Sequence, residues 1–179
     1  MNLPNKLTVL RVCMVPVFVV FMLWNGLGAA SKYVAAVIFI LASMTDWLDG
    51  YLARRDNLVT DFGKFMDPIA DKLLVCSALI CLVEKGALAA WIVIIIIGRE
   101  FIISGFRLVA SDKGVVIAAS YWGKFKTVSQ MLMVILLILD LGGVFNVAAQ
   151  ILIWIAVILT VISLVDYLVK NRGVLAGEM

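Results

Sequence analysis

Four aspartates with a regular spacing are the residues of this chain that can carry chemistry. Asp46 and Asp49 are three residues apart and Asp67 and Asp71 are four apart, so each pair falls on one face of a helix. The surrounding sequence is strongly apolar, and ionised side chains in such surroundings are costly unless they serve a function. Converging carboxylates repel one another, which favours bound cations, and ligand sets made only of oxygen favour Mg²⁺, Mn²⁺ or Ca²⁺.

Small residues accompany both acidic pairs. Gly50 and Ala53 share the face of the first pair within an arc of about 100°, and Gly63 shares the face of the second. Residues this small let a flat group or another helix lie against the backbone. Two divalent ions held by the four carboxylates can clamp a pyrophosphate and stabilise an in-line displacement at phosphorus. The structural alternative is a set of interfacial salt bridges to the neighbouring cations, which are Arg54, Arg55, Lys64 and Lys72.

The composition restricts the class of protein. Hydrophobic residues make up 64% of the chain and charged residues 15%, against about 25% charged in an ordinary soluble domain. There is no histidine, so acid–base and metal chemistry must use Asp, Glu, Lys, Tyr or Cys. A net charge of +3 is too small to indicate a nucleic acid partner. We therefore expect an integral membrane protein with one domain over residues 1–179.

Six membrane-spanning helices are expected, with cores at residues 7–25, 33–54, 64–84, 87–109, 122–140 and 147–169. Only the first and last contain an uncharged run near the roughly 20 residues that a span requires. Each of the middle four must include a charged stretch to cross, and all these stretches fall on one side of the membrane. The prediction is an all-α polytopic bundle with a polar cavity facing the cytoplasm. Pro68 suits a first helical turn, so the third helix is expected to start or kink near Asp67.

The basic residues indicate the orientation of the bundle. With the N-terminus inside, only Lys32 and Lys85 among the lysines and arginines fall on the outer side. The positive-inside rule then places both termini, and with them the charged helix ends that form the active site, in the cytoplasm.

The acidic segment resembles the signature of a known family. It runs Asp46-x2-Asp49-Gly50-x2-Ala53-Arg54-x8-Gly63-x3-Asp67-x3-Asp71, and it is similar, without a departure, to the signature of the CDP-alcohol phosphotransferases. The resemblance implies membrane enzymes, typically homodimeric, that move a phosphoalcohol unit from a CDP-linked donor onto an acceptor hydroxyl and release CMP.

Further segments resemble the bacterial phosphatidylglycerophosphate synthases within that family. These segments are Asn5-Lys-Leu-Thr8-x2-Arg11, Gly98-Arg99-Glu100, Gly105-Phe-Arg107 and Gly123-Lys124-x-Lys126-Thr127. The resemblance implies CDP-diacylglycerol as donor, sn-glycerol 3-phosphate as acceptor and the bacterial cell membrane as location.

The resemblance also implies roles for the residues of the signature. The metal-binding acids would be Asp46, Asp49, Asp67 and Asp71, holding two Mg²⁺ or Mn²⁺ ions. Asp71 would also be the base for the acceptor hydroxyl, although two cations beside it would weaken its basicity, so its role as a metal ligand is the safer hypothesis. The residues that would face the donor are Gly50, Ala53, Arg54 and Gly63.

A dianionic acceptor needs cationic contacts near the metals. The residues expected to bind its phosphate are Thr8, Arg11, Arg99, Arg107, Lys124 and Lys126. Arg99 and Arg107 share one broad face of the fourth helix, and a guanidinium suits bidentate phosphate binding. Glu100 lies near Arg107 on that helix and is expected to orient it. For each single lysine or arginine the alternative is a snorkelling anchor at the lipid headgroups.

The predicted function is a lipid-biosynthetic phosphatidyl transfer from CDP-diacylglycerol to glycerol 3-phosphate. The same chemistry with phosphatidylglycerol, inositol phosphate or serine as acceptor is the first alternative. A divalent-cation transporter that uses the carboxylates as an ion site is a more distant one.

Overall fold

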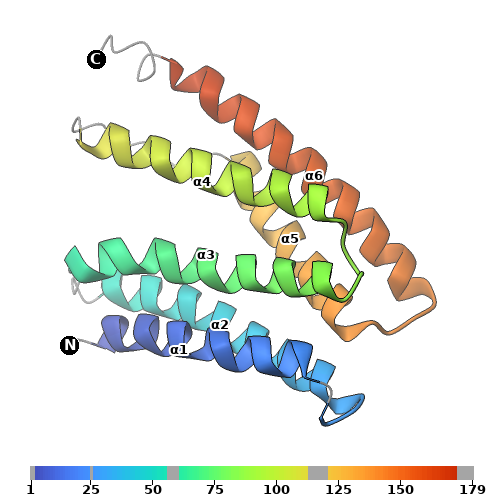
Figure 1. The fold of residues 1–179 in the computed structure, drawn as a ribbon. Coiled ribbons are helices and arrows are strands. Elements are labelled where there is room, and N and C mark those ends of the chain that lie inside the picture. Colours follow the sequence, from blue (N-terminus) through green and yellow to red (C-terminus); the bar gives the residue numbers. More distant parts are fainter. Residues whose placement is uncertain (1–2, 25, 56–60, 113–120, 173–179) are drawn as a thin grey trace. The chain divides into compact units, whose positions relative to one another are not determined.

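The computed structural model describes residues 3–24, 26–55, 61–112 and 121–172, and within the helices the side chains of residues 3, 4, 46–55, 61–65, 67, 68, 111 and 112 lie outside that description. All regular structure in the described residues is helical, with six helices and no strand (Figure 1). The helices are α1 (Leu3–Leu23), α2 (Ala30–Arg55), α3 (Asp61–Glu84), α4 (Ala90–Asp112), α5 (Tyr121–Leu139) and α6 (Val144–Lys170). The all-α prediction is confirmed, and each helix overlaps one of the six predicted cores.

The start of α3 differs from the prediction. The helix begins at Asp61 and continues past Pro68 to Glu84, so the expectation that it starts near Asp67 is wrong, while the alternative of a kink there stays a prediction. Proline lacks a backbone N–H, but a helix in an apolar medium tolerates it where neighbouring groups satisfy the freed carbonyl. Pro16 is a second proline inside a helix, in the middle of α1.

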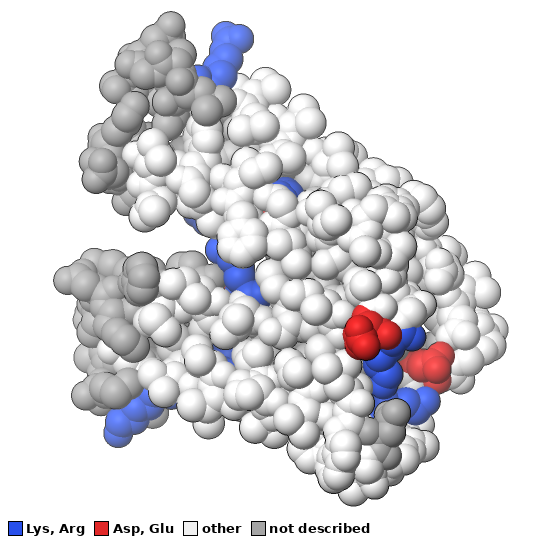
Figure 2. Space-filling model, viewed as in Figure 1, with Lys and Arg blue, Asp and Glu red and all other residues white. Residues whose placement is uncertain are grey.

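The surface of the described helices is that of a membrane protein. Among the described residues, three helical segments are long and apolar enough to cross a bilayer, and they are Asn5–Leu23, Tyr121–Leu139 and Val144–Lys170. A shorter apolar segment, Ala30–Thr45, covers the first part of α2. The face seen in Figure 2 is uncharged over most of its area. The crossing of the membrane by all six helices, and the cavity facing the cytoplasm, stay predictions.

The chain divides into two compact units. The N-terminal unit consists of residues 1–88 with 137–139, and the C-terminal unit of residues 89–136 with 140–179. The single-domain prediction is not tested by this division, because a membrane bundle can contain more than one compact cluster of helices.

In the N-terminal unit α1 packs against both α2 and α3. The rings of Phe18 and Phe39 meet between α1 and α2 with centroids 5.9 Å apart. Alanines fill completely buried positions of α2 and α3, namely Ala35, Ala42, Ala70 and Ala78 on the buried side of their helices. Small residues let helix backbones approach closely, which is the usual way that membrane helices pack.

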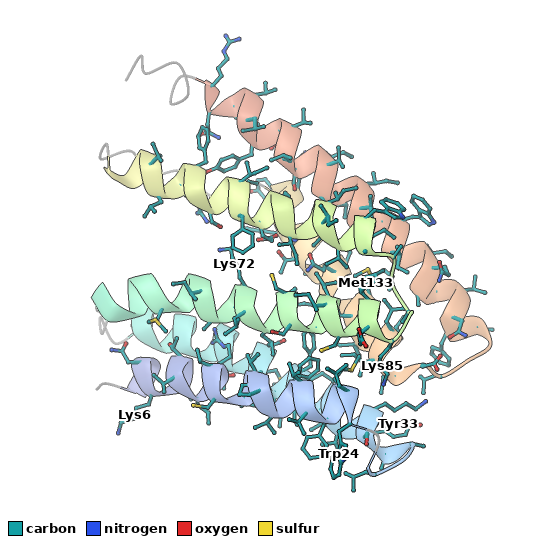
Figure 3. All side chains as sticks on the ribbon, in the orientation of Figure 1. Lys6, Trp24, Tyr33, Lys72, Lys85 and Met133 are labelled. Carbon is teal, nitrogen blue, oxygen red and sulfur yellow. The ribbon has the colours of Figure 1, made fainter. Side chains whose placement is uncertain are left out.

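A hydrogen bond fixes the direction of α1 relative to α3. Lys85 Nζ, just after α3, donates to the carbonyl oxygen of Met22 near the end of α1 at 3.0 Å. The C-terminal ends of the two helices are therefore together, and α1 and α3 run in the same direction. Figure 3 shows Trp24 and Lys85 at one end of this unit and Lys6 at the other.

In the C-terminal unit α4 and α6 lie side by side, also in the same direction (Figure 1). Two aromatic pairs establish this: Trp91 with Trp154, centroids 6.1 Å apart, and Phe106 with Tyr167, centroids 5.6 Å apart. The buried stripe of α6 alternates steps of four and three residues through Ala149, Ile153, Ala156, Thr160, Ser163 and Tyr167. Such spacing places one continuous face of a helix against its neighbours.

Candidate functional site

The helices bring the two acidic pairs to the same end of the N-terminal unit. The first pair lies in the last turns of α2, which ends at Arg55, and the second lies in the first half of α3, which begins at Asp61. The two helices contact each other. Helical register keeps Asp46 with Asp49, and Asp67 with Asp71, on one face each.

Asp71 is the one signature aspartate whose side chain is described. It is partly buried, next to the completely buried Ala70, and it interacts with a neighbouring group. The side chains of Asp46, Asp49 and Asp67 lie outside the described residues, so the convergence of the four carboxylates stays a prediction. The same holds for the residues expected to face the donor, which are Gly50, Ala53, Arg54 and Gly63.

The donor set fits a hard divalent cation. The four acids offer only carboxylate oxygens, placed in pairs on two adjacent helices, and hard cations such as Mg²⁺ prefer oxygen ligands. Among the residues whose side chains are described, no group of three or more His, Cys, Asp or Glu residues comes together.

Two residues of α1 predicted to contact the acceptor lie at the same end of the unit, because α1 begins where α2 ends and α3 begins (Figure 1). Thr8 is buried and Arg11 is 0% exposed. An arginine that is completely buried is not a snorkelling anchor, so that alternative is wrong for Arg11. A buried guanidinium needs partners to offset its desolvation, and Arg11 does interact with a neighbouring group.

Arg99 of α4 is held by two hydrogen bonds within the C-terminal unit. Its Nε donates to Ser163 Oγ at 3.0 Å, and its Nη1 donates to Glu100 Oε1 at 3.0 Å. A Cβ placed on Gly123 would lie 3.2 Å from Nη2, which is tighter than ordinary van der Waals contact. The two hydrogen bonds restrict rotation of the guanidinium group. The Arg99 side chain is 11% exposed.

Glu100 forms a second ion pair, with Lys126 of α5. Glu100 Oε1 accepts from Lys126 Nζ as well as from Arg99, which makes a cluster of two cations and one anion. The Lys126 side chain is only 2% exposed, so the snorkelling alternative is wrong for this lysine. The pairing of Glu100 with Arg107 stays a prediction.

The remaining two predicted phosphate contacts, Lys124 and Arg107, are exposed. Lys124 Nζ lies 5.3 Å from the centre of the Tyr121 ring, an arrangement that suits an anchor at the membrane interface. Of the four bases on α4 and α5, the structure thus brings Arg99 and Lys126 together through Glu100.

Sequence reasoning missed Ser163 entirely. The available signal was the stripe of α6 spaced by four and three residues, in which Thr160 and Ser163 are polar within an otherwise apolar helix. Buried hydroxyls in such a helix usually bond to a neighbouring group.

This cluster can bind an anion. Two cations contact one carboxylate, and Arg99 Nη2 donates no hydrogen bond to the residues that the structure describes. A guanidinium with a free edge suits a phosphate.

Comparisons with known proteins extend this description. The model of the CDP-alcohol phosphatidyltransferase family matches residues 1–162. The chain is 45% identical to the CDP-diacylglycerol–glycerol-3-phosphate 3-phosphatidyltransferase of Bacillus subtilis (strain 168), over 95% of each chain. It is 42% identical to the protein of that name from Haemophilus influenzae, over 99% of this chain and 97% of the other.

A third relative is the probable phosphatidylglycerophosphate synthase of Mycobacterium tuberculosis (strain CDC 1551 / Oshkosh), which is 44% identical over 98% of this chain and 84% of its own. The family model covers both the acidic signature and the Arg99–Glu100–Lys126 cluster. This chain belongs to the CDP-alcohol phosphatidyltransferase family.

Proposed function

We propose that this chain transfers a phosphatidyl group from CDP-diacylglycerol to sn-glycerol 3-phosphate, giving phosphatidylglycerophosphate and CMP. The observation that carries the proposal is the partly buried cluster of Arg99, Glu100 and Lys126 in a chain of this family. An acceptor that bears a phosphate needs fixed cations, whereas serine does not. The names of the relatives from Bacillus subtilis and Haemophilus influenzae agree with this choice of acceptor.

The acidic half of the site would hold divalent metal. Asp46, Asp49, Asp67 and Asp71 supply the oxygen ligands for two Mg²⁺ or Mn²⁺ ions. Such ions, when bound, offset the charge of the donor pyrophosphate and of the displacement at phosphorus.

The transfer itself is a displacement between two oxygens. The 1-hydroxyl oxygen of the acceptor bonds to the phosphatidyl phosphorus, and the bond from that phosphorus to the CMP oxygen breaks. Asp71, to which the resemblance assigns the role of base, takes the hydroxyl proton in addition to its role as ligand. Arg99 and Lys126 would hold the acceptor phosphate, which orients the hydroxyl for the displacement.

The donor is expected to lie along the small residues of the signature. Gly50, Ala53 and Gly63 leave room for the cytidine nucleotide beside the backbone, and Arg54 would contact its phosphates. The acyl chains would stay in the bilayer, since the surrounding helices are apolar.

We further propose a multi-pass protein of the bacterial inner membrane with both termini in the cytoplasm. In an arrangement of six consecutive spans, odd-numbered helices share one direction and even-numbered helices the other. The parallel pairs α1 with α3 and α4 with α6 support this. The homodimer is expected from the family resemblance alone.

An acceptor panel tests the proposed function. Purified protein is given CDP-diacylglycerol, Mg²⁺ and one acceptor at a time: glycerol 3-phosphate, phosphatidylglycerol, inositol phosphate or serine. We expect CMP release and phosphatidylglycerophosphate, identified by mass, with glycerol 3-phosphate only. Faster CMP release with serine or with phosphatidylglycerol would overturn the proposed acceptor. Uptake of metal into proteoliposomes without CMP release would favour the transporter.

A further inference from the structure

A polar side chain of α6 contacts Arg99 from outside the residues that the family model matches. Ser163 is 0% exposed, its Oγ accepts from Arg99 Nε at 3.0 Å, and the match to the family ends at residue 162. We propose that Ser163 is a positioning residue for the transfer reaction: it holds the Arg99 guanidinium in the orientation that binds the acceptor phosphate. This inference rests on the proposed function, since it concerns the acceptor half of that site.

The hydroxyl of Ser163 is oriented to act as an acceptor for Arg99. A serine hydroxyl has one donor hydrogen and two acceptor lone pairs. Ser163 Oγ uses its hydrogen on the carbonyl oxygen of Thr160, at 3.0 Å, within the same helix. Its lone pairs are therefore left for the Nε–H of Arg99, and the bond between helices has a fixed direction.

The other contacts of Arg99 leave one edge of the guanidinium for a ligand. Ser163 holds Nε and Glu100 holds Nη1, so two of the three nitrogens are fixed. Nη2 lies against Gly123, where there is no side chain, and donates no hydrogen bond to the described residues. The donors that remain for a phosphate are the two N–H groups of Nη2 and the second N–H of Nη1.

The position of Ser163 is itself well fixed. Aromatic contacts between α4 and α6 lie on both sides of it along the helix, one between Trp91 and Trp154 and one between Phe106 and Tyr167. Ser163 thus lies within the packed interface between α4 and α6. Its oxygen cannot move with Arg99 if the guanidinium rotates. A purely structural role as an interhelical hydrogen bond is the competing explanation.

Kinetics of the full-length chain separate the two explanations. Ser163→Ala removes the acceptor from Arg99 Nε, and the matched control is Thr160→Val. Thr160 is equally buried on the same helix, but its hydroxyl donates only to the carbonyl oxygen of Ala156. We expect Ser163→Ala to raise KM for glycerol 3-phosphate about three- to tenfold, as the loss of one hydrogen bond to a charged group implies. In Ser163→Ala, KM for CDP-diacylglycerol and kcat should stay within about twofold of the wild-type values. Ser163→Thr should have a KM for glycerol 3-phosphate close to that of the wild type, because threonine keeps the hydroxyl.

A double-mutant cycle completes the test. Lysine has no counterpart of the Arg99 Nε–H, so Ser163→Ala should have no further effect on KM in an Arg99→Lys background. If Arg99→Lys leaves KM for glycerol 3-phosphate unchanged, the acceptor site of the proposed function is wrong. If Arg99→Lys raises that KM but Ser163→Ala behaves like Thr160→Val, or lowers the thermal midpoint without changing KM, the positioning role is overturned and the proposed function stands.

Discussion

The carboxylate of Glu100 on α4 accepts a hydrogen bond from Lys126 of α5, a lysine whose side chain is 2% exposed. The same carboxylate oxygen accepts from Arg99, so one anion holds two cations. A lysine buried this deeply pays a desolvation cost that only a close partner offsets. Glu100 therefore helps to fix the positions of Arg99 and Lys126, the two cations that we propose bind the acceptor phosphate.

Replacing Glu100 by Gln should destabilise the protein. The change removes the carboxylate charge that Arg99 and Lys126 share, and we expect the free energy of unfolding to fall by about 2–3 kcal/mol, less than for a fully buried pair because Glu100 is partly exposed. Thermal unfolding in detergent measures this. Glu84→Gln, at an exposed position, is the control and should stay within about 0.5 kcal/mol. The double variant Glu100→Gln, Lys126→Met should recover part of the loss, and no recovery would contradict a direct pairing.

A second prediction concerns the space between Gly123 and the guanidinium of Arg99. A Cβ there would lie 3.2 Å from Arg99 Nη2, and Arg99 cannot shift easily because Nε and Nη1 are both bonded. Gly123→Ala should raise KM for glycerol 3-phosphate roughly three- to tenfold while KM for CDP-diacylglycerol is unchanged. Gly105→Ala is the matched control, since no heavy atom of the described residues lies within 4 Å of a Cβ there. It should stabilise α4 by about 0.5–1 kcal/mol. Equal KM values for glycerol 3-phosphate in the two variants would contradict the close approach of residue 123 to Arg99.

The helices were largely predictable from sequence because their ends coincide with charged or glycine-containing segments. The start of α3 was not, since Pro68 looks like a helix start, yet a proline inside an apolar helix is tolerated. Burial of single lysines was also not predictable. Lys124 and Lys126 are two residues apart on either side of Phe125, and tertiary contacts distinguish the exposed one from the buried one.

The candidate site was predictable where residues act through local spacing. The aspartate pairs are separated by three and four residues, so helical register alone groups them. The hydrogen bond from Arg99 to Ser163 joins residues far apart in the chain, and it depends on the packing of α4 against α6, which spacing alone does not specify.

The two lysines of α5 should differ in effect. Lys126→Met removes a buried cation from the acceptor pocket, and we expect KM for glycerol 3-phosphate to rise about 10- to 100-fold, as losing a charge-assisted hydrogen bond implies. Lys124→Met removes an exposed cation over the Tyr121 ring and should change that KM by less than about threefold. Steady-state kinetics with saturating CDP-diacylglycerol measure both. A larger effect at Lys124 would show that the acceptor pocket is elsewhere.

Metal removal should abolish the transfer. Oxygen-only ligands bind Mg²⁺ and Mn²⁺ reversibly, so EDTA should stop CMP release and an excess of either ion should restore it. Binding can be followed without turnover by the electron paramagnetic resonance of Mn²⁺, which should report bound ion in the wild-type protein and less in Asp71→Asn. Full activity in EDTA would show that the transfer needs no divalent metal ion.

The most direct test of the central claim is CMP release by purified wild-type protein and by Asp67→Ala, with CDP-diacylglycerol, glycerol 3-phosphate and Mg²⁺. If the signature aspartates hold the metal for phosphatidyl transfer, the wild type releases CMP only when glycerol 3-phosphate is present. Asp67→Ala should then lose at least about a hundredfold in rate, since a metal ion supplies several kcal/mol of charge stabilisation. Wild-type rates in Asp67→Ala would contradict the account.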